Sequence, residues 1–329
     1  MCFLEPDCVS INFDHRADVN GKYKCELNNV SHDGHEHDLR ENPNHVYHAA
    51  ESACLKNPWI NNATCQSSFT DKGHRCVCAA EFRGQDCDEG ATTCKEAHEM
   101  KMYVDVINDR DATYLLLRAN VSGVVTLLID SILVPVFCDV GDFGCGSGGW
   151  TPVMKIDCRK GTFHYSSSYW TDSNLPGGET GFDEQETKLA NYWSTSFSKI
   201  CLGMKSNEQL SFFAINKQAD SLYSLIADGQ YRETSLGHDT WKTLIDAAVS
   251  LQSKCNEEGF NVFCTFTISS KARIGIVSNQ EDECSTCDSR IVFSTGGYPY
   301  DTNSCGNVAK HNPDNGIKYI KAMGYILLQ

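Results

Sequence analysis

The spacing of hydrophobic and polar positions along this 329-residue chain changes near residue 94. Beyond it, apolar runs bounded by turn residues predict strands at 132–138, 210–215, 261–268, 272–278 and 322–328. Helices are predicted at 185–193, where acidic residues precede Lys188, and at 238–253. In the second helix, one face collects apolar side chains that we interpret as core, namely Trp241, Leu244, Ile245 and Ala248. This mixture of elements predicts an α+β fold class.

The first 94 residues have a different pattern. Nine of the 18 cysteines lie in them, and alternating apolar positions predict short strands at 8–13 and 24–28. Such small segments cannot bury much of a core, so disulfides must hold them, and disulfides persist in an oxidising compartment. We therefore predict a multidomain secreted, extracellular protein, in which small disulfide-rich modules precede one larger domain.

Net charge and hydropathy exclude several classes of partner. The formal charge is −15, and the sequence contains no basic stripe, which argues against binding to nucleic acid or anionic membranes. The longest apolar run, 124–137, is interrupted by Asp130, Ser131 and Pro135, so we predict no membrane span. Sequons at Asn29, Asn62 and Asn120 are candidate N-glycosylation sites.

A cysteine pattern between residues 50 and 88 resembles an EGF-like domain. Its C-terminal half is typified by Cys76-Val-Cys78 and by the loop that closes at Cys87. The resemblance implies the disulfides Cys54–Cys65 and Cys78–Cys87. Trp59 occupies the position of the second cysteine of such a domain. Two interpretations of Cys76 stay open: Trp59 packs where the disulfide would lie, or Cys76 pairs with another module or chain.

The segments Cys8–Phe13 and Lys24–Asn28 resemble the later part of a PAN/apple domain, expected over residues 1–49. This resemblance implies a Cys2–Cys8 disulfide and a partner for Cys25 upstream of Met1. The N-terminus also lacks the basic and apolar regions of a signal peptide. We therefore predict that the native transcript encodes an upstream segment with at least one more cysteine.

Three motifs in order, Ser122-Gly123, Cys138-Asp139 and Gly148-Gly149-Trp150-Thr151, resemble the opening of a fibrinogen-related domain. They imply a Cys94–Cys138 disulfide. Residues 94–329 look like the divergent, intelectin-like branch of secreted cnidarian proteins. The order of the three modules is similar to that of skeletal organic matrix proteins of reef-building corals. The eight cysteines after Cys138 allow 105 pairings.

Catalytic motifs are not evident: the sequence has no Gly-x-Ser-x-Gly elbow, His-Glu-x-x-His motif or P-loop, so we predict no enzymatic activity. Five histidines between residues 31 and 48 are compatible with a zinc or copper site or with a polar loop. His311 is interpreted as an isolated surface or core residue.

Two C-terminal loops are candidates for ligand binding. Asp282, Glu283 and Asp288 supply the hard oxygen ligands that calcium requires, so Ca²⁺ is the expected cofactor. The segment 294–301 adds a glycine-rich loop whose aromatic rings, Tyr298 and Tyr300, could stack on a sugar. The alternative is an acidic surface loop braced by disulfides.

The resemblances imply a secreted, non-enzymatic extracellular-matrix or adhesion protein, a component of a mineralising skeletal matrix. Its expected partners are matrix proteins or glycans, calcium, or a mineral surface. The alternative function is a soluble calcium-dependent lectin that recognises glycans.

Overall fold

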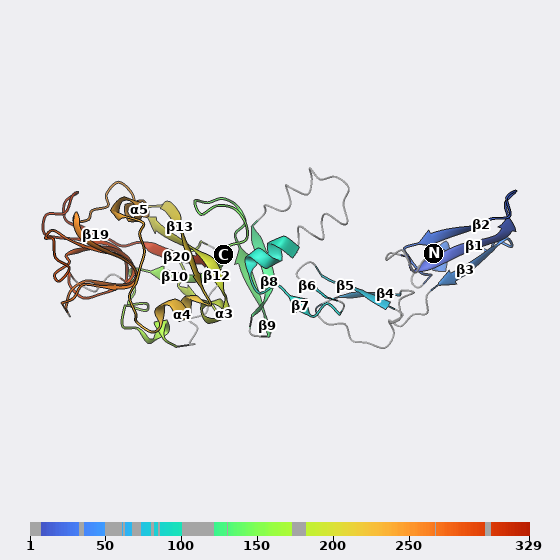
Figure 1. Ribbon diagram of the computed structural model, residues 1–329, viewed down its shortest axis with the longest axis horizontal. Coiled ribbons are helices and arrows are strands. Elements are labelled where there is room, and N and C mark those ends of the chain that lie inside the picture. The colour runs from blue at the N-terminus through green and yellow to red at the C-terminus, as the bar shows by residue number, and fades with distance from the viewer. Residues whose placement is uncertain are drawn as a thin grey trace. The chain divides into compact units, whose positions relative to one another are not determined.

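A computed structural model describes most of the chain as two compact units, Met1–Gly90 and Ala91–Gln329 (Figure 1). The described residues are 8–32, 36–49, 61, 63–67, 74–79, 82–84, 86–100, 122–129, 131–172, 182–266, 268–299 and 304–329.

The N-terminal unit contains short antiparallel sheets. The three-stranded one has the order β2-β1-β3, and its pairing aligns Phe13 with both Cys25 and Val46. Two further pairs of short strands, β4–β5 and β6–β7, follow along the chain. The elements are β1 (Ser10–Ala17), β2 (Tyr23–Asn28), the 3₁₀ turn η2 (Glu36–Asp38), β3 (His45–Ala49), β4 (Thr64–Ser67), β5 (His74–Val77), β6 (Phe82–Arg83) and β7 (Glu89–Gly90).

The C-terminal unit is built on two larger sheets. One has the order β11-β10-β20-β12-β13 and the other the order β14-β15-β16-β17-β18-β19. The first comprises β10 (Thr151–Asp157), β11 (Thr187–Lys188), β12 (Phe197–Ser206), β13 (Gln209–Ala219) and β20 (Met323–Leu328). The second comprises β14 (Arg232–Glu233), β15 (Lys254–Phe263), β16 (Lys271–Asn279), β17 (Ser289–Gly296), β18 (Cys305–Ala309) and β19 (Lys318–Ile320).

The remaining elements of this unit are short. A separate hairpin joins β8 (Gly123–Ile129) to β9 (Ile132–Cys138). Residues 94–100 are helical. The other helices are η4 (Ser168–Trp170), α3 (Asn191–Ser194), α4 (Leu222–Ile226) and α5 (His238–Lys242).

One apolar cluster forms the main core of the C-terminal unit. It draws on both sheets, through Ile156 and Leu202 of the first and Ile274 and Phe293 of the second. Trp241 of α5 is fully buried in the same cluster. Because the two sheets share this core, they form a layered β structure, with η4, α3, α4 and α5 packed on it. The helix at 94–100 packs instead on the β8–β9 hairpin.

The predicted α+β class is wrong, because the described part of the chain is mostly β, with 45% of its residues in strands and 11% in helices. The segment 238–253 is helical only as far as Lys242. Beyond it, backbone N–H groups donate to side chains that are distant in the sequence: Ser250 N to Asn307 Oδ1 (3.0 Å) and Gln252 N to Ser289 Oγ (2.9 Å). The interpretation of the apolar stripe as core is confirmed for Trp241, Leu244 and Ile245, which are buried in the main core, whereas Ala248 is partly buried.

The helix predicted at 185–193 is also mostly absent. Thr187 and Lys188 instead form β11, which pairs with Lys155 and Met154 of β10. Here tertiary pairing overrides local helix preference.

Most of the strands predicted for this unit are present. The prediction at 132–138 coincides with β9, and those at 210–215, 272–278 and 322–328 fall within or within one residue of β13, β16 and β20. The prediction at 261–268 is correct only as far as Phe263, where β15 ends.

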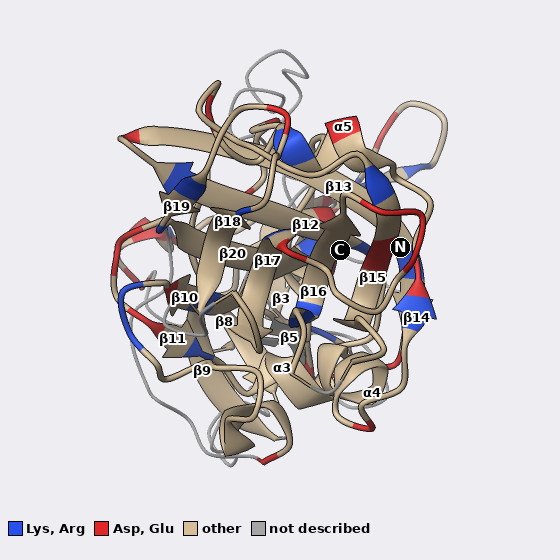
Figure 2. Cartoon of the chain, turned by 90° about the vertical axis from the view of Figure 1, so that its left-hand side faces the viewer, with Lys and Arg blue, Asp and Glu red and all other residues tan. Residues whose placement is uncertain are grey.

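Charged positions do not gather on one face of the C-terminal unit in the view of Figure 2. Asp and Glu lie in several of its loops, and α5 carries Asp239. This distribution fits a solvated acidic surface.

Candidate functional site

The loop that follows β17 is fixed by a buried arginine. Arg290, on β17, is fully buried. Its Nη1 donates to the carbonyl oxygen of Tyr298 (3.2 Å), and its Nη2 donates to that of Pro299 (3.3 Å). Ser270 Oγ also donates to the Tyr298 carbonyl (2.8 Å). Several donors thus hold the backbone of this loop, and the guanidinium fork suits that task because its donors are rigidly arranged.

Glycine is required at the start of the same loop. Gly297 has φ +75°, and a Cβ atom there would lie 1.9 Å from the carbonyl oxygen of Ser269. Any larger residue would therefore force the loop away from the β15–β16 connection. The next side chain, that of Tyr298, lies at the surface, where 40% of the residue is exposed.

A cluster of aromatic and cationic side chains surrounds Tyr298, and we call Tyr298, Lys310, His311 and Tyr319 the tyrosine platform. The Tyr298 hydroxyl lies 3.1 Å from His311 Nε2, and the two rings stack with centroids 6.4 Å apart. Lys310 Nζ lies 5.4 Å from the Tyr298 ring centroid and 5.6 Å from that of Tyr319. The ammonium group therefore interacts with both rings.

Strand pairing creates this platform. The β18–β19 pairing sets Val308 opposite Tyr319, and Lys310 follows directly after β18. The side chain of Gln252 then fixes the chain beyond β18, because its Nε2 donates to the carbonyls of Lys310 (3.1 Å) and His311 (2.8 Å). The platform thus presents partly exposed rings on a hydrogen-bonded support, which is an arrangement suited to binding.

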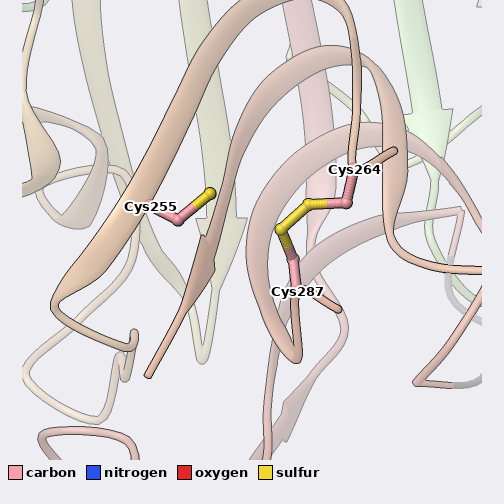
Figure 3. Close-up of side chains that lie close together, drawn as sticks. All are labelled: Cys255, Cys264 and Cys287. Atoms are coloured by element: carbon pink, nitrogen blue, oxygen red, sulfur yellow. A yellow bond between two sulfur atoms is a disulfide. The ribbon is translucent and has the colours of Figure 1, made fainter. Parts of the chain in front are cut away.

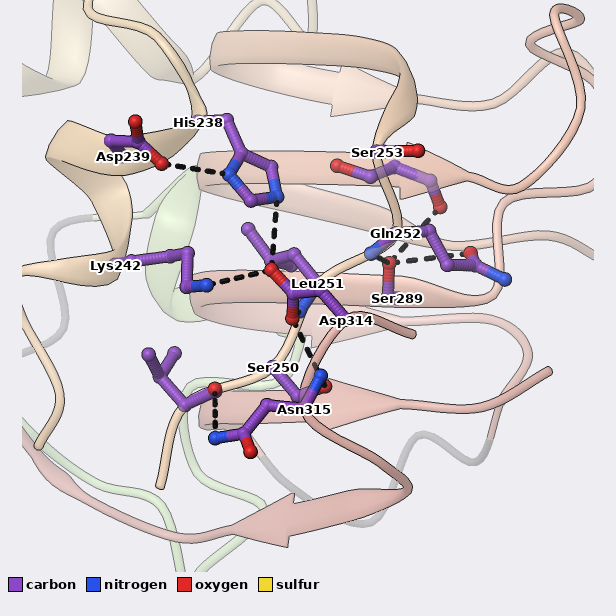
Figure 4. Close-up of polar contacts among 12 residues, drawn as sticks. His238, Asp239, Lys242, Ser250, Leu251, Gln252, Ser253, Ser289, Asp314 and Asn315 are labelled. Carbon is purple, nitrogen blue, oxygen red and sulfur yellow. Dashed lines mark hydrogen bonds and ion pairs between the residues drawn. The ribbon is translucent and has the colours of Figure 1, made fainter. Parts of the chain in front are cut away.

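Asp314 organises the neighbouring loop (Figure 4). Its Oδ2 accepts a hydrogen bond from Lys242 Nζ (2.7 Å), and its Oδ1 accepts one from the backbone N–H of Leu251 (3.0 Å). His238 Nε2 lies 4.0 Å from Oδ2. Burial raises the pKa of this carboxyl, but Lys242 and the Leu251 N–H outweigh it, so the net pKa is lowered.

The three residues predicted to bind calcium have different surroundings. Asp282 Oδ2 accepts from Lys254 Nζ (2.9 Å) at an exposed position. Glu283 is engaged within its own turn: its Oε1 accepts from Thr286 Oγ1 (2.7 Å). Among the described side chains, these carboxylates do not form a group of three or more converging metal ligands. Calcium binding there remains a prediction from the sequence.

Asp288 lies beside the platform instead. Burial raises the pKa of its carboxyl, whereas nearby His311 lowers it and the Glu281 carboxylate raises it further. Its backbone carbonyl accepts from the N–H of Lys310 (3.1 Å). The structure therefore brings Asp288 to the platform and leaves Asp282 and Glu283 in the preceding turn.

Among the described residues, one group of possible metal ligands does converge, and it consists of cysteines. The sulfur atoms of Cys255, Cys264 and Cys287 lie within 4.8 Å of one another (Figure 3). Cys264 is bonded to Cys287, and Cys255 to Cys284. Metal binding requires thiolates, so this cluster of oxidised cysteines is a pair of adjacent disulfides and not a metal site. These disulfides brace the acidic turn.

Six disulfides join cysteines that both lie among the described residues. Two are pairs that the resemblances imply, Cys78–Cys87 and Cys94–Cys138. The other four lie in the C-terminal unit and had no expected pairing: Cys145–Cys201, Cys158–Cys305, Cys255–Cys284 and Cys264–Cys287.

Other predicted residues are only partly within the described part of the chain. Cys8 and Cys65 are disulfide-bonded, but Cys2 and Cys54, their implied partners, lie outside the described residues. Of the sequons, Asn29 is exposed after β2, whereas Asn62 and Asn120 lie outside the described residues, as does Tyr300.

Sequence patterns indicate Tyr298 as a candidate but do not indicate Arg290, Lys310 or Tyr319, and they leave His311 isolated. No local motif marks these residues, because only the pairing of β17, β18 and β19 brings them together. Within the described residues, no helix is both long and apolar enough to cross a membrane. No protein-family model matches the chain, and a search of curated proteins finds no significant match.

Proposed function

We propose that the chain is a secreted, non-enzymatic matrix or adhesion protein that binds its partners through the tyrosine platform. The observation that carries this proposal is the contact of Lys310 with the rings of both Tyr298 and Tyr319, two partly exposed residues. Six disulfides among the described residues support an extracellular location. The finer proposal, a mineralising skeletal matrix, rests on the resemblance of the module order.

The same platform supports a second candidate, a soluble lectin. Aromatic rings bind the apolar faces of sugars, and the Lys310 ammonium and Asp288 carboxylate offer hydrogen bonds to hydroxyl groups. A lectin requires saturable binding to defined sugars, and calcium dependence would make that binding sensitive to EDTA. A matrix protein is instead expected to be retained by an insoluble matrix fraction.

The test uses the full chain and three variants. Tyr298→Ala and Tyr319→Ala remove the platform rings, and Tyr223→Ala is the control because Tyr223 has similar exposure, 38%, on α4. We expect sedimentation with insoluble matrix to fall at least several-fold in both platform variants and to persist in the control. Equal retention of all four proteins would refute the platform's role.

Arg290→Lys tests the support beneath the platform. Lysine keeps the positive charge but has a single donor nitrogen, so it cannot reproduce the separate contacts of Nη1 with the Tyr298 carbonyl and Nη2 with the Pro299 carbonyl. We expect weaker retention in this variant with its circular-dichroism spectrum preserved. A glycan array run with calcium and with EDTA then distinguishes the two candidate functions.

A further inference from the structure

The outer edge of β2 presents an exposed thiol on an exposed strand. Within the described residues, β2 pairs on one side only, with β1, and lies at the edge of its sheet. Cys25, near its centre, is exposed and forms no disulfide. Exposed edges of this kind offer backbone groups for pairing with another strand. The PAN/apple resemblance gives Cys25 a partner upstream of Met1, and pairing with a second chain is the alternative, because a cysteine left over in a disulfide-rich secreted protein suggests an intermolecular bond or a free reactive thiol.

One face of this sheet is apolar and partly exposed. Side chains alternate along a strand, so Tyr23, Cys25 and Leu27 share a face. Tyr23 is 57% exposed and Leu27 is 42% exposed. The register continues this face across β1, where Phe13 lies opposite Cys25, and its ring stacks on that of Tyr23.

The sequence of β2 is complementary to itself in the antiparallel direction. If two β2 strands pair about a two-fold axis at Cys25, Tyr23 lies opposite Leu27 of the second copy, and Lys24 lies opposite Glu26. Both charged side chains are exposed and, in the single chain, pair within the strand (2.6 Å). Each apolar residue thus meets an apolar residue and each charge meets its opposite, as a symmetric interface requires.

The same register brings the two Cys25 residues directly opposite each other. Residues directly opposite in an antiparallel pair have Cα atoms about 4.5–5.5 Å apart. That spacing falls within the range of about 4.4–6.8 Å found for disulfides. We propose that this chain forms a homodimer through the edge strand β2. The β2 strands of two copies pair antiparallel, and a Cys25–Cys25 disulfide links the copies covalently.

The bond forms by thiol–disulfide exchange with a disulfide oxidant such as oxidised glutathione. One Cys25 thiolate attacks the oxidant and releases one reduced thiol. The second Cys25 thiolate then attacks the mixed disulfide and releases the other. Two cysteine thiols are oxidised and one oxidant disulfide is reduced to two thiols, so electrons and protons balance.

The experiment incubates the full chain in a glutathione redox buffer and measures its mass under non-reducing conditions. We expect a dimer that reduction converts to monomer, with a Cys25–Cys25 linkage in the peptide map. Cys25→Ser should abolish the covalent dimer, whereas Cys76→Ser should retain it. A monomeric wild-type chain, or a dimer linked through other cysteines, would overturn the proposal.

Charge reversal tests the register itself. Lys24→Glu places two glutamates opposite each other at both ends of the pairing and should lower the dimer yield several-fold. The double variant Lys24→Glu/Glu26→Lys restores opposite charges and should restore the yield. Lys321→Glu, at an exposed position in the C-terminal unit, is the control. Equal yields in all variants would refute the antiparallel register.

Discussion

Replacing the buried carboxylate of Glu258 should destabilise the C-terminal unit substantially. Glu258, on β15, is 7% exposed, and its side chain accepts hydrogen bonds from α5 and from the segment that leads into it. The donors are Trp241 Nε1 (2.6 Å), Gly237 N (2.9 Å), Thr234 Oγ1 (3.0 Å) and Leu236 N (3.2 Å). One carboxylate therefore fastens this segment to the second sheet.

The substitution Glu258→Gln keeps the volume but changes the acceptors. The glutamine side-chain oxygen can replace Oε2, which accepts from Trp241, Thr234 and Leu236. The glutamine NH₂ group then takes the place of Oε1 and faces the backbone N–H of Gly237, which is also a donor. An unsatisfied buried donor costs about 1–3 kcal/mol, and the remaining bonds lose their charge assistance. Because glutamine is neutral, it avoids the desolvation cost of a buried charge, and this offsets part of the lost stability. We therefore expect the free energy of unfolding to fall by about 2–4 kcal/mol.

Differential scanning calorimetry on the full chain measures the effect. For a unit of this size, each 1 kcal/mol lowers Tm by about 2–4 °C, so the expected fall is roughly 4–16 °C. Glu208→Gln is the control, because its side chain is 86% exposed. A Glu258→Gln variant within a degree of wild type would refute the role assigned to this carboxylate.

Two further predictions concern Asp314 and calcium. Because folding lowers the pKa of Asp314, its ionised carboxylate stabilises the folded chain. This stabilisation is present above the ordinary carboxyl pKa of about 3.9 and is lost as the pH falls through the folded pKa. Asp314→Asn should therefore lose less stability than wild type on acidification in a Tm-against-pH series, and parallel curves would contradict this reasoning. If the loop around Asp282 and Asp288 binds calcium, adding calcium to EDTA-treated protein should raise the free energy of unfolding, by about 2.7 kcal/mol at a hundredfold excess over Kd. The Tm should rise with it. Replacing both aspartates with asparagine should remove that rise, and a rise that survives would contradict calcium binding at this loop.

Local patterns in the sequence predicted several features that depend on near neighbours. The strand at 132–138 coincides with β9. The Cys78–Cys87 pair, at a sequence separation of nine, was implied by the resemblance to an EGF-like domain. An apolar run bounded by turn residues contains most of the information that a strand needs, since the period of its side chains is local. The burial of Trp241 was predictable for the same reason.

Only the tertiary structure decided the fold class, the four disulfides that had no expected pairing, and the platform. The segment after Lys242 has a helical pattern but gives its N–H groups to Asn307 and Ser289, which local propensity cannot anticipate. Cys158 pairs with Cys305 across 147 residues. Lys310 and Tyr319 meet Tyr298 because strands β17, β18 and β19 are adjacent in the sheet. The sequence by itself determined local elements, and its resemblance to known modules implied two of the disulfides. Contacts between distant segments depend instead on packing free energy summed over the whole unit.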